Sequence, residues 1–423
     1  MLQQDAVLEE RTGTVLFWIR FPSPWYYCSV MSEACALIYS ESYQDYSFSP
    51  WHPMKPERLM LSAELMRSFG LFERDNIGTV EPRLASDEEL ALVHDPAYIE
   101  KVRELSEPGV SEIGAGRWGL GTGDNPVFPR MHEAAGTIAG GALVAAGKVM
   151  EGELDHAFHV GGGLHHAQRA RASGFCVYND VALAAAWLRK KYQARVLYLD
   201  FDAHHGDGVQ GFFYNDPAVM TVSFHESGRY LFPGTGYSDE AGDGAGRGYA
   251  VNLPLAPHTT DDIFLNAFDE LVPVMARAFK PDIIITQNGC DAHFSDPLTH
   301  LSLTLSGFQA LAARLHRLVH EVAGGRWLGS GGGGYQAYTV VPRVWTSLMA
   351  EMGGASLPEE LPAEWRALCA RFADNDVPLY LTCEHPPKIK PAAHAAAAQS
   401  ARKGIEEIKR TILPLVASIA PGD

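Results

Sequence analysis

The sequence has 423 residues, and 51 acidic residues against 34 Lys and Arg give it a net charge of −17. This acidic balance argues against a nucleic-acid partner, because phosphate binding needs many Lys and Arg side chains. No apolar run approaches the roughly 20 residues that cross a bilayer, so we expect no membrane association. The six cysteines include no CxxC pair, and we expect reduced thiols in a cytoplasmic protein.

Residues 1–31 form a leader that we expect to be disordered or outside the core. Its apolar stretch, residues 15–30, is interrupted by Arg20, Pro22 and Pro24. Acidic residues come before that stretch, whereas a signal peptide has a basic start and an uninterrupted apolar block. The leader is therefore not expected to be a signal peptide.

Behind the leader, short apolar runs that end in Gly, Asp or His alternate with longer helical patterns. Such runs are typical of buried strands in a parallel sheet. The expected strands cover 157–160, 196–199, 219–224, 283–286 and 327–328, and the expected helices cover 132–150, 180–192, 259–279 and 306–323. This alternation predicts a single α/β domain over residues 32–354, with a large, mostly parallel sheet flanked by helices.

Residues 355–423 have a different composition and are expected to form a C-terminal helical appendage. Residues 355–390 are rich in proline and contain two helical fragments. An alanine-rich tract, 392–398, and an amphipathic stretch, 404–416, follow. We expect this segment to pack on the core or to assist oligomerisation, and we assign it no chemistry.

Polar residues gather at the expected carboxyl ends of the strands, where open parallel sheets bind ligands. Asp202 and His204 lie at i and i+2 after a buried strand, so in extended backbone they project to the same side. A third ligand must come from another strand, and Asp291 stands at the end of one. Three protein ligands with an open fourth position define a catalytic zinc site, although these donors also suit Fe²⁺, Mn²⁺ or Co²⁺.

Two adjacent histidines, His165 and His166, follow three glycines, which suggests close backbone approach to a ligand. Hydrolysis needs a base for the water and an acid for the leaving group, and two histidines with different carboxylate partners can divide these tasks. Asp200 and Asp207 are available to orient them. Tyr335 follows a second glycine block, and its hydroxyl can stabilise an oxyanion. Taken alone, Tyr335 would be better interpreted as a packed aromatic residue.

Together these motifs resemble the zinc-dependent histone deacetylase family, and within it the bacterial acetoin-utilisation proteins. The resembling segments follow the family's order over roughly residues 34–350, and they are 52–58, 121–128, 162–167, 173–180, 200–208, 232–236, Asp291 and 331–335. The whole series in order is far more specific than any one motif. The resemblance implies an arginase/deacetylase-like fold and hydrolysis of acetyl-lysine to lysine and acetate.

The resemblance also implies a role for each matching residue. The implied metal ligands are Asp202, His204 and Asp291, and the implied catalytic residues are His165, His166, Asp200, Asp207 and Tyr335. The implied substrate-binding residues are the tunnel walls Gly174, Phe175, Phe232 and Leu298, the rim carboxylate Asp124, and Arg58 in an inner cavity for acetate. Family members also bind potassium, and the matching positions are Asp200, Asp202, His204, Ser223 and Phe224, with Phe213, Asp216, Val219 and Tyr249 at a second site.

The acetoin-utilisation resemblance implies an acetylated metabolic enzyme, such as an acetyl-CoA synthetase, as the substrate. It implies Zn²⁺ as the catalytic ion, with Fe²⁺ as the alternative, and structural K⁺. The sequence departs from the eukaryotic enzymes at Cys290, where they usually carry Ser or Ala. The residues around Tyr338 lack the arginine that eukaryotic nuclear members use for an inositol-phosphate corepressor contact.

Three other functions compete with protein deacetylation. An acetylpolyamine amidohydrolase would use the same chemistry on a smaller cation. A two-manganese ureohydrolase would need a second set of bridging carboxylates, for which His293 and Asp296 are the nearby candidates, and it has no obvious use for the paired histidines. The third is a non-catalytic acetyl-lysine-binding protein. The presence of all the proposed metal ligands together with both histidines and Tyr335 argues against it, because binding alone does not need them.

Overall fold

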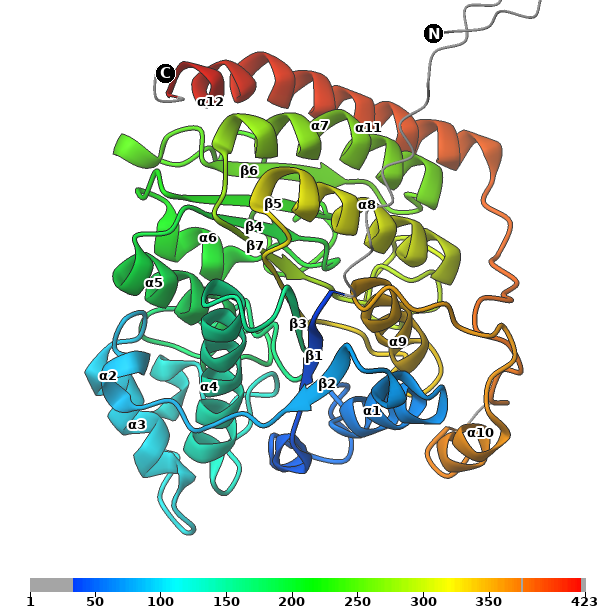
Figure 1. Ribbon diagram of the computed structural model, residues 1–423. Helices are drawn as coiled ribbons and strands as arrows, with labels where there is room; N and C mark the ends of the chain where they lie inside the picture. Colours follow the sequence, from blue (N-terminus) through cyan, green and yellow to red (C-terminus); the bar gives the residue numbers. More distant parts are fainter. Residues whose placement is uncertain (1–32, 374–375, 420–423) are drawn as a thin grey trace, which may run out of the picture. The chain divides into compact units, whose positions relative to one another are not determined.

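The computed structural model describes residues 33–373 and 376–419, and the leader expected over residues 1–31 lies outside this range. Eight strands form one sheet in the order β2-β1-β3-β8-β7-β4-β5-β6 (Figure 1). They are β1 (Cys35–Ile38), β2 (Ile77–Val80), β3 (His156–His159), β4 (Val196–Asp200), β5 (Val219–Glu226), β6 (Ala250–Leu255), β7 (Ile283–Gln287) and β8 (Trp327–Ser330). Every neighbouring pair is parallel, which confirms the predicted α/β class.

The central strands are buried along their whole length. All residues of β4 and β7 are buried, and the two strands pair in register from Val196 opposite Ile283 to Asp200 opposite Gln287. Strands that are covered on both faces by helices are expected to be continuously apolar, as these two are until their last residues. The polar residues therefore appear only where the strands end.

Helices cover the two faces of the sheet. They are α1 (Glu57–Ser68), α2 (Asp87–Leu90), α3 (Pro96–Ser106), α4 (Met131–Met150), α5 (Asp180–Tyr192), α6 (Asp207–Phe213), α7 (Asp261–Phe279), α8 (Leu305–Ala323), α9 (Val341–Met352), α10 (Ala363–Cys369), α11 (Pro391–Thr411) and α12 (Leu413–Ile419). Figure 1 shows α4, α5 and α6 on one side of the strands and α1, α8 and α9 on the other. Helix α5 begins where the sequence predicts, because the Asn179 side chain accepts a hydrogen bond from the backbone N–H of Ala182.

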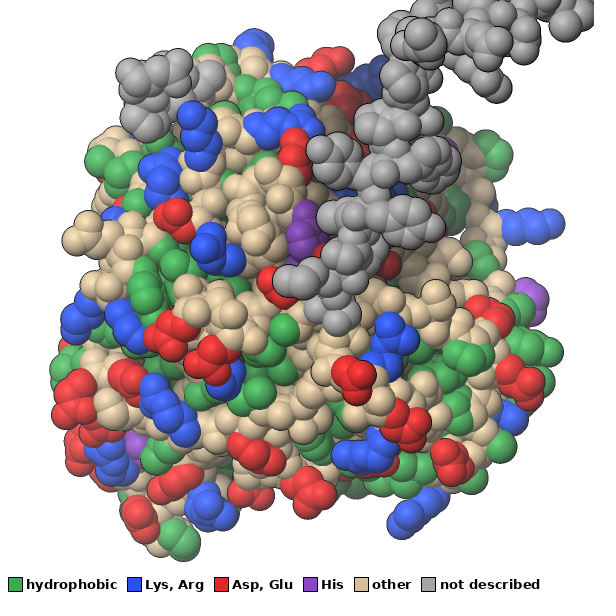
Figure 2. All heavy atoms as spheres, in the orientation of Figure 1, with side chains coloured by type: hydrophobic (Ala, Val, Ile, Leu, Met, Phe, Trp, Pro, Cys, Tyr) green, Lys and Arg blue, Asp and Glu red, His purple; other side chains and the backbone are tan. Residues whose placement is uncertain are grey.

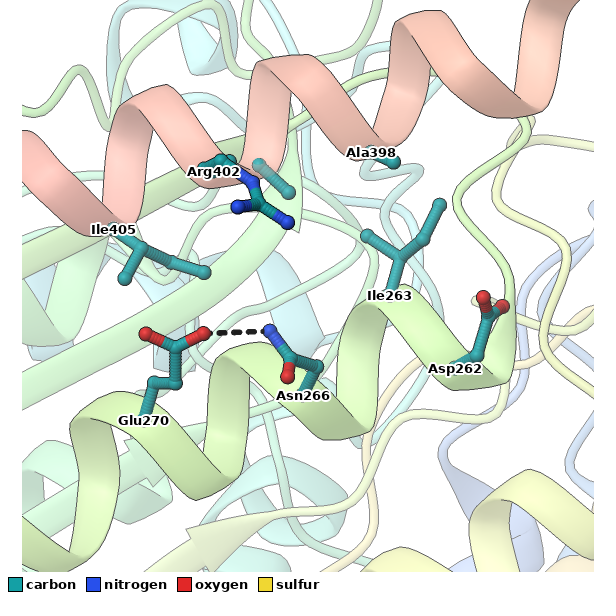
Figure 3. Close-up of a pocket in the computed structure, with 8 residues that line it drawn as sticks. Asp262, Ile263, Asn266, Glu270, Ala398, Arg402 and Ile405 are labelled. Atoms are coloured by element: carbon teal, nitrogen blue, oxygen red, sulfur yellow. Dashed lines mark hydrogen bonds between the residues drawn. The ribbon is translucent and has the colours of Figure 1, made fainter.

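In the C-terminal segment, one long helix replaces two expected pieces. The alanine-rich tract and the first part of the amphipathic stretch join into α11, which packs against the edge strand β6 and against α7, and the rest of the stretch continues into α12. Between α7 and α11 lies a hollow of about 250 Å³, where Glu270 accepts a hydrogen bond from Asn266 (Figure 3). The described part of 355–390 contains one helix, α10, where two were expected, because prolines interrupt the rest.

Basic side chains on the face drawn in Figure 2 are scattered among acidic ones. Within residues 33–373 and 376–419, none of the helices combines the length and the apolar character needed to cross a membrane.

Candidate active site

Four neighbouring strands, β3, β8, β7 and β4, carry the site. Because they are parallel, their carboxyl ends meet at one edge of the sheet. The loops after them bring in His165 and His166 after β3, Asp202 and His204 after β4, Asp291 after β7, and Tyr335 after β8. Segments that are more than 160 residues apart in the sequence thereby reach one place.

The start of α5 holds the histidine loop in position. The buried Asp180 carboxylate accepts hydrogen bonds from the backbone N–H groups of Gly163 (3.0 Å) and Leu164 (2.7 Å). The Asn179 side-chain amide donates to the carbonyl of His165 at 3.0 Å. Both anchors are fully buried, so the loop is fixed from the core side.

Asp202, His204 and Asp291 form a buried group whose donor atoms all lie within 4.8 Å of one another. His204 Nδ1 lies 3.1 Å from Asp202 Oδ1 and 2.8 Å from Asp291 Oδ2. Backbone amides hold the carboxylates: Ala203 N–H donates to Asp291 Oδ1 at 2.8 Å, and Gly333 N–H donates to Asp202 Oδ2 at 2.7 Å. Two carboxylates and one imidazole are thus fixed around a common point.

This group fits a divalent metal. Burial and the neighbouring Asp202 carboxylate raise the pKa of Asp291 to about 7, because two like charges lie close together in a buried place. The turn after β8 leaves room only for glycine, because a Cβ on Gly333 would lie 2.1 Å from Asp291 Oδ2. Oxygen and imidazole donors suit Zn²⁺ and Fe²⁺, and three ligands leave coordination positions for water and substrate.

His165 and His166 form a hydrogen-bonded pair, each with its own carboxylate. His165 Nδ1 donates to Asp200 at 2.9 Å, and His166 Nδ1 donates to Asp207 at 2.7 Å. Their Nε2 atoms lie 3.0 Å apart. Because both Nδ1 atoms are donors, a hydrogen bond between the Nε2 atoms requires one ring to be charged and the other neutral.

The surroundings decide which ring carries the charge. For His165, the Asp200 and Asp202 carboxylates outweigh the effect of burial and raise the pKa to about 9. For His166, burial and the charge of His165 lower the pKa to about 4. At neutral pH the charged ring is therefore His165, and His166 is the proton acceptor of the pair.

A cavity of about 230 Å³ leads to this centre. Its lining consists of Asp124, His166, Gly174, Phe175, His204, Leu231, Phe232, Leu298 and Tyr335. The Phe232 ring lies 5.1 Å from that of His166, and the Phe175 ring lies 5.8 Å from that of Tyr335. Aromatic walls on both sides fit a narrow apolar stem better than a bulky substituent.

Gly174 is required where the wall approaches the histidines. It has φ +51°, and a Cβ there would lie 2.4 Å from His166 Cδ2 and 2.9 Å from Phe232. Deeper in the protein, Arg58 is buried beside a second, small cavity shared with Tyr335 and Met54. Its guanidinium donates to the carbonyl of Gly334 at 3.0 Å.

Tyr335 lies between the two cavities, with its ring 6.3 Å from that of His204. Its backbone N–H donates to Asp296 at 2.8 Å, which fixes the residue after the glycine turn. Burial and the nearby Asp291 and Asp202 carboxylates raise the pKa of Tyr335 well above its usual value. The phenol therefore stays protonated and can donate a hydrogen bond.

The positions matched to potassium sites lie in two groups. In the first, Asp200 and Ser223 face each other in the register of β4 and β5, beside Asp202, His204 and Phe224. In the second, Phe213, Asp216 and Val219 follow one another in the turn from α6 to β5, and Tyr249 precedes β6, where its carbonyl accepts from Thr221.

Comparison with known proteins identifies the family. The model of the histone deacetylase domain matches residues 52–352. The acetoin utilization protein AcuC of Bacillus subtilis (strain 168) is 50% identical over 328 residues, which cover 78% of this chain and 84% of that protein. AcuC of Staphylococcus aureus (strain MSSA476) is 43% identical over 335 residues, with 79% and 86% covered. The chain belongs to the histone deacetylase family.

Solved structures of histone deacetylase homologues share the fold. A homologue from Aquifex aeolicus has a TM-score of 0.76 at 30% identity, covering 88% of this chain and 100% of that one. A homologue complexed with SAHA has a TM-score of 0.77 at the same identity and coverage. The arginase/deacetylase fold, the family and the similarity to bacterial acetoin-utilisation proteins are confirmed, and this deacetylase is a metal-dependent hydrolase.

Some residues of the site were not expected from the sequence. Leu231 lines the cavity beside Phe232, and nothing in its type distinguishes it from a core residue. Tyr198, on β4, donates from its hydroxyl to Asp200 at 2.6 Å. Gln287, the last residue of β7, donates to the carbonyl of Gly163 at 2.8 Å. Its place at the end of a strand was the only sequence feature that could have indicated a role in the site.

Proposed function

We propose that this deacetylase hydrolyses Nε-acetyl-lysine in proteins to lysine and acetate. The observation that carries the proposal is the cavity lined by Phe175 and Phe232, which reaches the group of Asp202, His204 and Asp291 through His204. An apolar passage suits the methylene stem of lysine, and the polar end suits the amide. Asp124, on the cavity lining, is available to accept a hydrogen bond from the substrate backbone.

We assign the metal to Asp202, His204 and Asp291, with Zn²⁺ as the resident ion and Fe²⁺ as the alternative that these donors also accept. When bound, the ion supplies Lewis-acid activation of water and of the acetyl carbonyl. K⁺ is assigned to the two groups of positions around β4, β5 and the end of α6. The Arg58 cavity is assigned to the departing acetate, because its guanidinium supplies the positive charge.

The remaining steps belong to the side chains. The neutral ring of His166, held at Nδ1 by Asp207, exchanges the hydrogen bond from His165 for the attacking water and accepts the water proton at Nε2. The hydroxyl of water joins the acetyl carbon, and Tyr335 donates a hydrogen bond to the carbonyl oxygen as negative charge develops there. His166, now protonated, then gives this proton to the lysine nitrogen as the C–N bond breaks. Asp200 keeps His165 charged beside this reaction.

We further infer that the substrate is an acetylated metabolic enzyme such as an acetyl-CoA synthetase, in the cytoplasm. The names of the bacterial relatives support a role in acetoin utilization. The five cysteines in the described residues are all free, and four of them are buried, which supports a reducing compartment.

The test is acetate release from acetyl-lysine peptides, from acetylated acetyl-CoA synthetase and from acetylated polyamines, with metal content measured on the same sample. We expect the peptides and the acetylated enzyme to be turned over with a higher kcat/KM than the polyamines. The reverse order would assign the site to polyamine deacetylation. Binding of acetyl-lysine without any acetate release would make the protein a non-catalytic reader.

The role of Tyr335 is tested by Tyr335→Phe, with Tyr380→Phe, an exposed tyrosine outside the cavity, as the control. Losing one oxyanion donor costs about 3 kcal/mol in the barrier, or on the order of a hundredfold in kcat. Full activity of Tyr335→Phe with an intact metal content would show that another group stabilises the oxyanion.

A further inference from the structure

A second group of metal-binding side chains lies at the opposite edge of the sheet. Glu33 comes two residues before β1, and His156 is the first residue of β3. His316 and His320 lie one turn apart on α8. Since the catalytic residues follow the carboxyl ends of the strands, this group at the amino ends is separate from the active site.

The four side chains converge on one point. Glu33 Oε2 lies 2.9 Å from His316 Nε2 and 3.3 Å from His156 Nε2, and Glu33 Oε1 lies 3.0 Å from His320 Nε2. The Nε2 atoms of His156 and His320 are 3.3 Å apart. In a tetrahedral zinc site with bonds of about 2.0–2.1 Å, ligand atoms are separated by about 3.3 Å. The four observed separations, from 2.9 to 3.3 Å, are close to this value.

A network of hydrogen bonds alone explains this arrangement poorly. If each Nε2 carried a proton for Glu33, the protons of His156 and His320 would face each other across 3.3 Å. A metal ion removes this conflict, because it accepts a lone pair from each neutral ring.

The surroundings orient a second ligand. His316 Nδ1 lies 3.1 Å from Glu351 Oε1 on α9, so its other nitrogen is directed at Glu33 and the common point. A carboxylate behind a ligating imidazole is the usual support for a metal-bound histidine. The rings of His156 and His316 also pack on Trp327, with centroids 5.6 and 6.0 Å away.

We propose that Glu33, His156, His316 and His320 bind a second divalent transition-metal ion, with Zn²⁺ as the best fit. Four protein ligands fill a tetrahedral site, so this ion is structural and not catalytic. It links the segment before β1 to β3 and α8, which are far apart in the sequence. Side chains of Glu33 and His320 are 30% and 38% exposed, so the ion can enter from solvent.

The experiment counts zinc ions on the full chain after equilibration in zinc buffer and gel filtration. We expect two ions per chain in the wild type, and one in His320→Ala and in Glu33→Gln. The control is His394→Ala, which removes a histidine of similar exposure (41%) paired with a single carboxylate, Asp262, and should retain two ions. Deacetylase kcat/KM should stay within twofold in all three variants, because none lines the cavity.

An Asp291→Asn background isolates the second ion from the catalytic one. There we expect one zinc ion per chain, and a melting temperature that rises by several degrees when zinc replaces chelator. Adding His320→Ala should abolish both the ion and the rise. The proposal is overturned if the wild type holds a single zinc that Asp291→Asn removes, or if His320→Ala and Glu33→Gln retain the full zinc content. Failure of the proposed deacetylation would leave these counts unchanged.

Discussion

Replacing Gly333 by alanine places a methyl group against the two carboxylates assigned to the catalytic metal. The added Cβ would lie 2.1 Å from Asp291 Oδ2 and 2.9 Å from Asp202 Oδ2. Gly333 does not have a positive φ, so alanine brings no backbone strain of its own. The change therefore acts through the space that the ligands need.

The size of the effect follows from these distances. Real Cβ atoms stay at least 3.0 Å from such neighbours, so Asp291 must move by roughly 1 Å. Metal–ligand distances tolerate deviations of about 0.2 Å. Disturbing even a residue that supports a ligand costs about 10–100-fold in metal affinity. Gly333→Ala should therefore weaken binding by at least about 1.4–2.8 kcal/mol.

The assay is deacetylase activity against buffered free zinc, which reports the catalytic ion even if a second ion binds elsewhere. The midpoint should move to at least tenfold higher zinc in Gly333→Ala. Gly116→Ala is the matched control, because its Cβ would meet no atom within 4 Å, and its midpoint should not move. An unchanged midpoint in a folded Gly333→Ala protein would refute the assignment of these carboxylates to the metal.

Two further predictions concern the cavity wall and a buried histidine. Phe232→Ala removes an aromatic wall of the cavity and should raise KM for acetyl-lysine peptides about tenfold, through roughly 1–2 kcal/mol of lost apolar contact; an unchanged KM would exclude that wall from binding. Burial lowers the pKa of His94 to about 4, whereas a histidine in the unfolded chain binds its proton at about pH 6.5. The free energy of unfolding should therefore fall by about 3 kcal/mol as the pH drops from about 6.5 to 4. The urea midpoint should fall less steeply with pH in His94→Gln than in the wild type. Equal slopes in the two proteins would show that His94 is not the group whose protonation destabilises the fold.

The fold was predictable where hydrophobic periodicity is strong. Strands β4 and β7 are continuous apolar runs, and α5 has both an apolar pattern and an asparagine cap. Strand β6 was not expected, because Asn252 and Pro254 indicate a turn in a single sequence. Proline is tolerated there because β6 pairs only with β5 and lies at the edge of the sheet.

In the site, side chains with distinctive chemistry could be named from the sequence, whereas backbone contacts could not. Asp202, His204 and Asp291 stand at strand ends, where their types are unusual. The N–H of Gly333 that binds Asp202 depends on the path of a glycine turn, which the sequence does not specify. Leu231 becomes part of the cavity only through the position of its loop.

The group around Glu33 shows the same limit in another form. His316 and His320 have the i, i+4 spacing of two ligands on one helix face, which the sequence displays. Glu33, however, precedes β1, whereas His156 begins β3, and only the parallel pairing of β1 with β3 brings them together.

Both edges of the sheet therefore gather carboxylates and imidazoles, but with different consequences. At the carboxyl edge, there are three ligands and one of them, His204, lines a cavity, so a bound ion keeps positions for water and substrate. At the amino edge, four ligands surround one point, and Trp327 packs against two of the rings. The donor types are therefore similar at the two sites. What distinguishes the hydrolytic site from the structural one is the number of ligands and the presence of a cavity beside them.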